Sequence, residues 1–121
     1  MDFEDAKVVI ATHYLVYGCP QALREYLIDR RIQELLFIAH PLNPAAQGGS
    51  YFEKISKGNI CEKKTINERK KHGVIGYFRE LVWNIQTVAR GKIRYDLFVG
   101  IDNLNACAGI ILRKLKLVSK V

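Results

Sequence analysis

Three short, continuous apolar runs constrain the fold of this chain more than any other feature of its sequence. They are Val8–Ala11, Leu35–Ala39 and Leu97–Ile101, and segments with helical periodicity lie between them. Apolar runs of this length, without polar alternation, are typical of strands that are buried on both faces of a parallel sheet. The alternation of such strands with helices predicts a three-layer α/β domain in which the three runs are adjacent and parallel.

The segments between the runs complete the predicted architecture. Apolar residues at helical spacing predict helices over three segments: Pro20–Arg31, Val74–Arg90 and Leu104–Leu117. Two strands, Tyr51–Lys57 and Ile60–Ile66, are predicted to form a hairpin that turns at Gly58 and Asn59. The fold class is therefore α/β, with a mainly parallel sheet plus a β-hairpin. Val118–Val121 reads as the opening of one more strand, so we expect the domain to be incomplete at its C-terminus.

The segment Val74–Arg90 carries the strongest amphipathic pattern. Its predicted inner face consists of the apolar residues at 3.6-residue spacing, namely Val74, Phe78, Leu81, Val82, Ile85, Val88 and Ala89. Trp83 falls outside this face and shares the polar side with Arg79, Gln86 and Arg90. Two interpretations remain open. The tryptophan belongs to a basic, aromatic surface suited to lipid headgroups, or it packs against a neighbouring loop or domain.

The charge balance favours anionic partners. The formal net charge is +7 over 121 residues, a field that attracts phosphorylated sugars, nucleotides, acidic lipid surfaces or nucleic acid. The basic residues lie in a connector and at helix ends, without an aromatic ladder or a recognised nucleic-acid motif, so no specific nucleic acid is predicted. The three cysteines form no CxxC pair, which argues against a disulfide framework and a zinc site. With no signal peptide in the sequence, we expect a cytoplasmic protein, peripheral to a membrane if it meets one.

Cofactor and metal motifs are missing from the sequence. The first strand–helix loop contains the single Gly18 rather than GxGxxG, and no GxxxxGK[ST] or GxSxG motif occurs. No cofactor is therefore predicted. His13, His40 and Asp102 lack the local spacing of a metal site, so no metal is predicted either.

Polar residues follow two of the predicted parallel strands. In open α/β sheets, ligands bind beyond the carboxyl ends of the strands, where the strand order reverses. The loops Thr12–Cys19 and Asp102–Asn105 would line that crevice, while the loop that begins at His40 would lie farther out. The predicted substrate-binding residues are His13, Tyr14, Gly18, Asp102, Asn103 and Asn105. A competing interpretation is that Asp102 and Asn103 cap the helix that follows.

The order of these segments resembles a known family. KVVIATHYLVYGCPQALREYL, ELLFIAHPL and YDLFVGIDNLNACAGIILRKLKLVSKV together resemble the N-terminal, Rossmann-like domain of retaining glycosyltransferases of the two-Rossmann-domain (GT-B) type, closest to the group-4 class. The resemblance covers essentially the whole chain. In that family this domain receives the acceptor, and a second domain, which would lie beyond residue 121, binds the nucleotide sugar.

The resemblance implies a function and partners. Residues 1–121 would be the acceptor-side domain of an enzyme that moves a sugar from a nucleotide sugar to an acceptor hydroxyl on a glycan or lipid, and this segment alone would be inactive. His13 is the candidate to assist the acceptor hydroxyl, because only its charge among the six site residues changes near neutral pH. The alternatives are a stand-alone basic binding module and a non-catalytic regulatory subunit.

Overall fold

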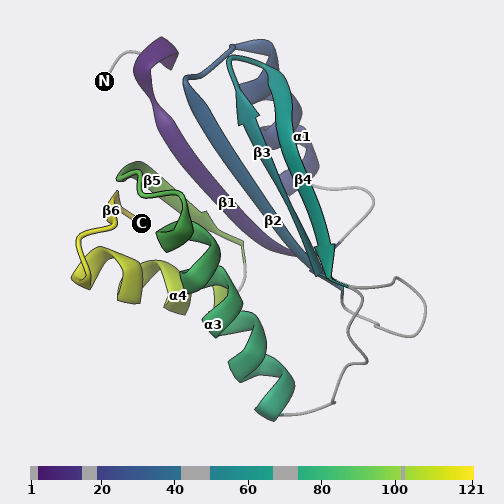
Figure 1. The fold of residues 1–121 in the computed structure, drawn as a ribbon, viewed down its shortest axis with the longest axis vertical. Helices are drawn as coiled ribbons and strands as arrows, with labels where there is room; N and C mark the ends of the chain where they lie inside the picture. Colours follow the sequence, from purple (N-terminus) through teal and green to yellow (C-terminus); the bar gives the residue numbers. More distant parts are fainter. Residues whose placement is uncertain (1–2, 15–18, 42–49, 67–73, 102) are drawn as a thin grey trace.

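A computed structural model describes residues 3–14, 19–41, 50–66, 74–101 and 103–121 of the chain. The strands are β1 (Lys7–Tyr14), β2 (Glu34–Pro41), β3 (Ser50–Ser56), β4 (Asn59–Ile66), β5 (Tyr95–Gly100) and β6 (Val118–Lys120). The helices are a 3₁₀ turn, η1 (Phe3–Asp5), and α1 (Cys19–Asp29), α3 (Val74–Arg90) and α4 (Asn103–Lys114). The strands form one mixed sheet in the order β4-β3-β2-β1-β5-β6 (Figure 1).

The three apolar runs are adjacent parallel strands, as the sequence predicts. β1 pairs in parallel with β2 on one side and with β5 on the other, so that Val8 lies opposite both Leu35 and Leu97. β6 adds a fourth parallel strand beside β5, which confirms the strand expected at Val118. Ile101 is a correction, because it lies just after β5 and is exposed. The α/β class and the central parallel strands are thus confirmed.

The predicted hairpin is present, with its turn one residue earlier than expected. β3 pairs antiparallel with β2 and with β4, and Ser56 lies opposite Asn59. The loop residues are therefore Lys57 and Gly58, whose φ angles are 51° and 84°. Two consecutive positive φ angles are typical of the type I′ turn, which matches the twist of the two strands. The glycine takes the second position of the loop and not the first.

Each face of the sheet carries its own core, and this produces three layers (Figure 1). Along β1, Val8 and Ile10 face α1, whereas Val9 and Ala11 face α3 and α4. The α1 side is closed by buried apolar residues of the sheet and Leu27. The other side is closed by residues that include Val88 of α3 and Leu112 of α4, packed on Phe98 and Tyr95. Side-chain alternation along the strands thus assigns every core residue to one layer.

Helix α3 is rotated relative to the face that the sequence predicts. Phe78 and Val82 were expected inside, but their side chains are 62% and 47% exposed. The residues that α3 buries at four-residue spacing are Glu80, Asn84 and Val88. Hydrogen bonds that Glu80 and Asn84 make at the sheet stabilise this rotation. Periodicity of apolar residues alone misplaces the helix because two of its inward positions are polar.

Trp83 turns toward the sheet with that rotation. Its ring lies 5.4 Å from the ring of His40 in an edge arrangement and 5.9 Å from the ring of Phe52, measured between centroids. Arg79, Gln86 and Arg90 remain exposed. Trp83 is therefore part of the packing between α3 and strands β2 and β3, and it does not share an outward surface with the two arginines. No helix among the described residues is long and apolar enough to cross a membrane.

Candidate functional site

The strand order reverses between β1 and β5. From β1 the chain passes through α1 on one face to β2, and it returns through α3 on the opposite face to β5. Ligand sites of open α/β sheets lie at the carboxyl ends of the strands on either side of such a reversal. Here those ends are His13 and Tyr14 of β1 and Gly100 of β5.

On the face of the sheet that α3 and α4 cover, the last side chains of β1 and β2 are both histidines. Val9, Ala11 and His13 share one face of β1, and in β2 the corresponding residues are Leu36, Ile38 and His40. The register pairs His13 directly with His40, and their ring centroids are 5.8 Å apart. The last inward position of each strand is thus polar, and both imidazoles lie beneath α3. His40 belongs to β2 itself and not to an outer loop, which corrects the expectation that it lies farther out.

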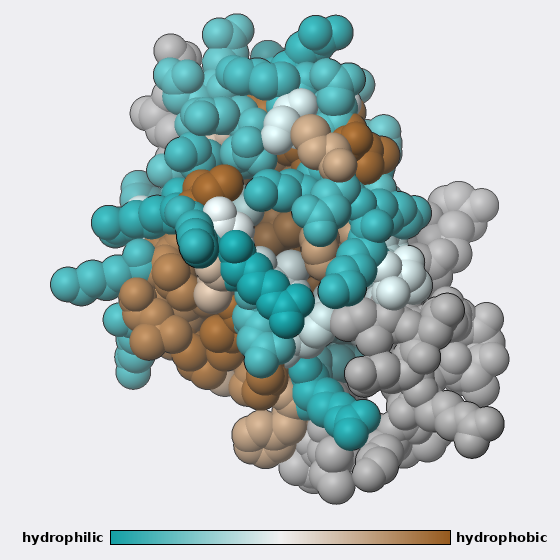
Figure 2. Space-filling model, viewed as in Figure 1, coloured by the Kyte–Doolittle hydropathy of each residue, from teal (hydrophilic) through white to brown (hydrophobic). Residues whose placement is uncertain are grey.

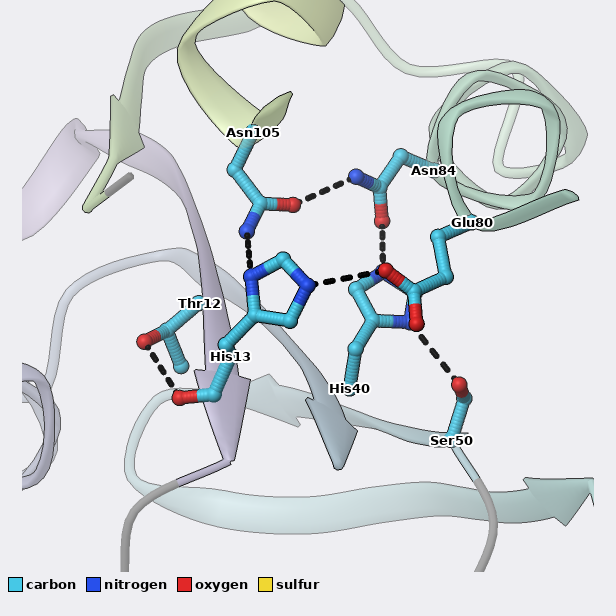
Figure 3. Close-up of polar contacts among 7 residues, drawn as sticks. All are labelled: Thr12, His13, His40, Ser50, Glu80, Asn84 and Asn105. Atoms are coloured by element: carbon cyan, nitrogen blue, oxygen red, sulfur yellow. Dashed lines mark hydrogen bonds and ion pairs between the residues drawn. The ribbon is translucent and has the colours of Figure 1, made fainter. Parts of the chain in front are cut away.

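His13 lies between a carboxylate and an amide (Figure 3). Its Nε2 atom is 2.8 Å from Oε2 of Glu80 on α3, and its Nδ1 atom is 3.4 Å from Nδ2 of Asn105 in the first turn of α4. The side chains of His13 and Glu80 are 15% and 11% exposed, whereas Asn105 is fully buried. His13 and Glu80 are therefore the members of this group that a ligand from solution can reach.

A second set of contacts joins His40 to the same group (Figure 3). His40 Nε2 lies 2.6 Å from the amide oxygen of Asn84, and the amide nitrogen of Asn84 donates to Oδ1 of Asn105 at 2.6 Å. His40 Nδ1 lies 2.8 Å from the hydroxyl of Ser50 at the start of β3. Asn84, Asn105 and His40 are each fully buried. We refer to His13, His40, Ser50, Glu80, Asn84 and Asn105 as the polar cluster.

The hydrogen bonds of the polar cluster have one consistent direction. Asn84 accepts through its oxygen, so His40 donates from Nε2 and accepts at Nδ1 from Ser50. Asn84 then donates to Asn105, and Asn105 donates to Nδ1 of His13. With Nδ1 accepting, neutral His13 carries its proton on Nε2 and donates it to the carboxylate of Glu80. The amide orientations in the structure thus specify both histidine tautomers.

Gly100 lets α4 approach the end of β5 and so places Asn105. A Cβ atom added at Gly100 would lie 2.5 Å from the backbone nitrogen of Ala106 and 2.8 Å from the carbonyl carbon of Asn105. No side chain fits in that space, so the first turn of α4 packs directly on the strand backbone. Asn105 consequently lies within hydrogen-bond distance of both β1 and α3.

The six residues predicted to bind substrate divide into two groups. His13 and Asn105 come together at the strand reversal, as expected. Tyr14 is the last residue of β1 and Asn103 is the first residue of α4, while their side chains, with Gly18 and Asp102, lie outside the described residues. Asn103 is the first helical residue of α4, and an N-cap precedes the first helical residue, so the capping interpretation concerns Asp102, which lies outside the described residues.

Sequence reasoning missed four members of the polar cluster: His40, Ser50, Glu80 and Asn84. Two signals could have identified three of them. His13 and His40 occupy equivalent positions at the ends of equivalent apolar runs, and Glu80 and Asn84 stand at four-residue spacing with Val88 on one helix face. Ser50 has no such signal in the sequence. Among the described residues, no group of His, Cys, Asp and Glu could hold a metal ion.

Comparisons with known proteins give this chain no relative. No protein-family model, no curated protein and no solved structure matches it.

Proposed function

We propose that the chain is the acceptor-side, Rossmann-like domain of a two-domain glycosyltransferase, and that the polar cluster receives a hydroxyl group of the acceptor. The observation that carries the proposal is the His13–Glu80 pair at the carboxyl end of β1, beside the strand reversal. An imidazole backed by a carboxylate is a suitable partner for a hydroxyl group that must lose its proton. The resemblance of the three sequence segments to retaining, group-4-like glycosyltransferases supports the same function.

His13 can take up a hydroxyl proton while it keeps its contact with Glu80. Its contact with Asn105 is 3.4 Å long, beyond the usual range for a strong hydrogen bond, so an acceptor hydroxyl can replace Asn105 at Nδ1. Proton transfer to Nδ1 produces an imidazolium whose Nε2–H still donates to Glu80. The carboxylate stabilises this charge as it develops, which is the role of the orienting acid in other histidine-based sites.

The acceptor oxygen forms a bond to the anomeric carbon of the donor sugar, and the bond from that carbon to the phosphate oxygen of the nucleotide breaks. The hydroxyl proton moves to His13, and the nucleotide leaves with the electron pair. Donor binding belongs to a second domain, so residues 1–121 alone are expected to give no turnover with any nucleotide sugar. Sugar transfer catalysed by these residues alone would contradict this part of the proposal.

Binding of simple glycosides tests the proposed acceptor site. Saturation-transfer NMR with a panel of methyl glycosides should show contact with the chain, and His13→Ala and Glu80→Gln should each reduce it. Glu25→Gln is the matched control, because Glu25 is exposed on α1, on the opposite face of the sheet. Equal signals from the three variants, or no signal from any glycoside, would count against a hydroxyl-binding site.

A further inference from the structure

The exposed charges in the C-terminal part of the described chain are all of one sign. From Phe78 to Val121, eight exposed side chains in the described part of the chain are charged and all eight are basic: Arg79, Arg90, Lys92, Arg94, Arg113, Lys114, Lys116 and Lys120. The described acids of this stretch point elsewhere, because Glu80 is buried and Asp96 accepts a hydrogen bond from the backbone of Lys7. Helix α1 on the opposite face exposes both signs, with Glu25, Asp29 and Arg30.

The same layer exposes apolar side chains. Phe78 and Val82 of α3 are 62% and 47% exposed, and Ile110 of α4 and Leu115 are 44% and 57% exposed. Figure 2 shows hydrophobic side chains gathered at the left of the view, over α4 and the adjoining part of α3, with hydrophilic side chains around them. The packed helices α3 and α4 and the turn after α4 thus expose apolar residues in a part of the chain whose described, exposed charged side chains are all basic.

We propose that this α3–α4 surface docks on an anionic lipid bilayer. Lysine and arginine gain from the negative potential of such a membrane, and apolar side chains gain by entering the boundary between headgroups and acyl chains. A second copy of the chain fits less well, because a symmetric contact would place cations against cations. Nucleic acid satisfies the cations but leaves Val82, Ile110 and Leu115 without an apolar partner.

This surface differs from the one that Trp83 suggested. Trp83 packs inward on His40 and Phe52, so the membrane-facing part of α3 is the stripe of Phe78 and Val82 that was expected in the core. The proposal uses no residue of the polar cluster. It therefore stands or fails independently of the proposed acceptor site.

Vesicle sedimentation tests the docking surface with matched variants. The 121-residue chain should bind phosphatidylcholine vesicles that contain about one third phosphatidylserine and should be released by about 1 M salt. Each basic residue near such a surface contributes about fivefold to the partition coefficient, so Arg113→Ala/Lys114→Ala should weaken binding roughly 30-fold. Lys63→Ala/Lys64→Ala on β4 removes the same charge from the sheet edge and should change binding by less than about threefold.

Apolar variants separate a bilayer from other partners. Phe78→Ser/Val82→Ser should weaken vesicle binding, whereas Tyr26→Ser on α1 should leave it unchanged; Tyr26 is also exposed. Circular dichroism confirms that each variant is folded. The proposal is overturned if anionic vesicles are not bound, or if the two pairs of basic residues contribute equally. It is also overturned if Phe78→Ser/Val82→Ser abolishes a dimer seen by ultracentrifugation, or if duplex DNA binds while vesicles do not.

Discussion

Replacing Asn84 by alanine tests whether the polar cluster is one connected network. Asn84 is fully buried, and its side chain joins His40 to Asn105 through two contacts of 2.6 Å. The substitution removes one partner from each of these two buried residues. A buried polar atom that loses its partner costs about 1–3 kcal/mol, so for the two atoms together we expect Asn84→Ala to lower the free energy of unfolding by about 2–6 kcal/mol. This is a large part of the total stability of a small domain.

Urea unfolding measures the effect, with Gln86→Ala as the control. Gln86 is exposed on the same helix, two residues along the chain, and its replacement should change the free energy by less than about 0.5 kcal/mol. The midpoint should fall for Asn84→Ala while the slope with urea stays constant, because the folded state keeps its extent of burial.

A double-mutant cycle with Asn105→Ala then isolates the bond between the two amides. Because the two side chains share one hydrogen bond, the double variant should cost less than the sum of the single variants, by about 0.5–3 kcal/mol. Additive effects, or an Asn84→Ala variant as stable as Gln86→Ala, would refute the network.

Three further predictions concern other parts of the fold. In the same urea assay, Gly100→Ala should lower the free energy of unfolding by about 1–3 kcal/mol, because the added Cβ forces α4 away from β5. Gly91→Ala should lower it by less than about 0.5 kcal/mol, because its added Cβ would meet its nearest atom at 3.6 Å. Glu53→Ala should cost about 3 kcal/mol, because it leaves the largely buried Arg24 without its two-bond carboxylate partner; a change below about 1 kcal/mol in thermal unfolding would show that the pair is not stabilising. Burial, and then the charge of Glu34, raises the pKa of Tyr95 to about 12, so the folded state favours the neutral phenol. The stability that this preference contributes is complete below about pH 10 and is lost as the pH rises to about 12. Over that range the free energy of unfolding should fall by about 3 kcal/mol more for the native chain than for Tyr95→Phe. Parallel curves of unfolding free energy against pH would contradict this.

The strands could be predicted because their apolar composition indicates burial on both faces. Val8–Ala11, Leu35–Ala39 and Leu97–Ile101 contain no charged residue, and only a sheet covered on both faces accepts such segments. Their adjacency in the sheet followed from the same pattern. The hairpin turn was misplaced by one residue because Lys57 adopts a positive φ that its side chain gives no reason to expect.

The left-handed residues that follow the helices could not be predicted from residue type either. α3 ends at Arg90, as predicted, but the left-handed residue that follows it is Lys92, and Arg31 and Lys116 adopt positive φ angles just after α1 and α4. At Lys116 the backbone bonds from Lys116 to Arg113 and from Leu117 to Leu112 explain the conformation, because they satisfy the last carbonyls of the helix.

Two of the six members of the polar cluster could be predicted from the sequence. His13 and Asn105 were predicted from their position after parallel strands, a rule that needs only the strand order. Glu80 and Asn84 were missed because periodicity assigns polar residues to the outside of a helix. Only the three-dimensional match between α3 and the two histidines makes these positions favourable inside.

The central claim is that His13 receives the acceptor hydroxyl at Nδ1 while its Nε2 donates to Glu80. The NMR signals of the two ring nitrogens of His13 test this claim most directly. A long-range proton–nitrogen correlation spectrum distinguishes a protonated imidazole nitrogen from a bare one. In neutral His13 we predict the proton on Nε2, toward Glu80, and a bare Nδ1 whose resonance moves when a methyl glycoside is added. The resonances of buried His40 should stay unchanged. A His13 proton on Nδ1, or a glycoside response at His40 without one at His13, would contradict the account.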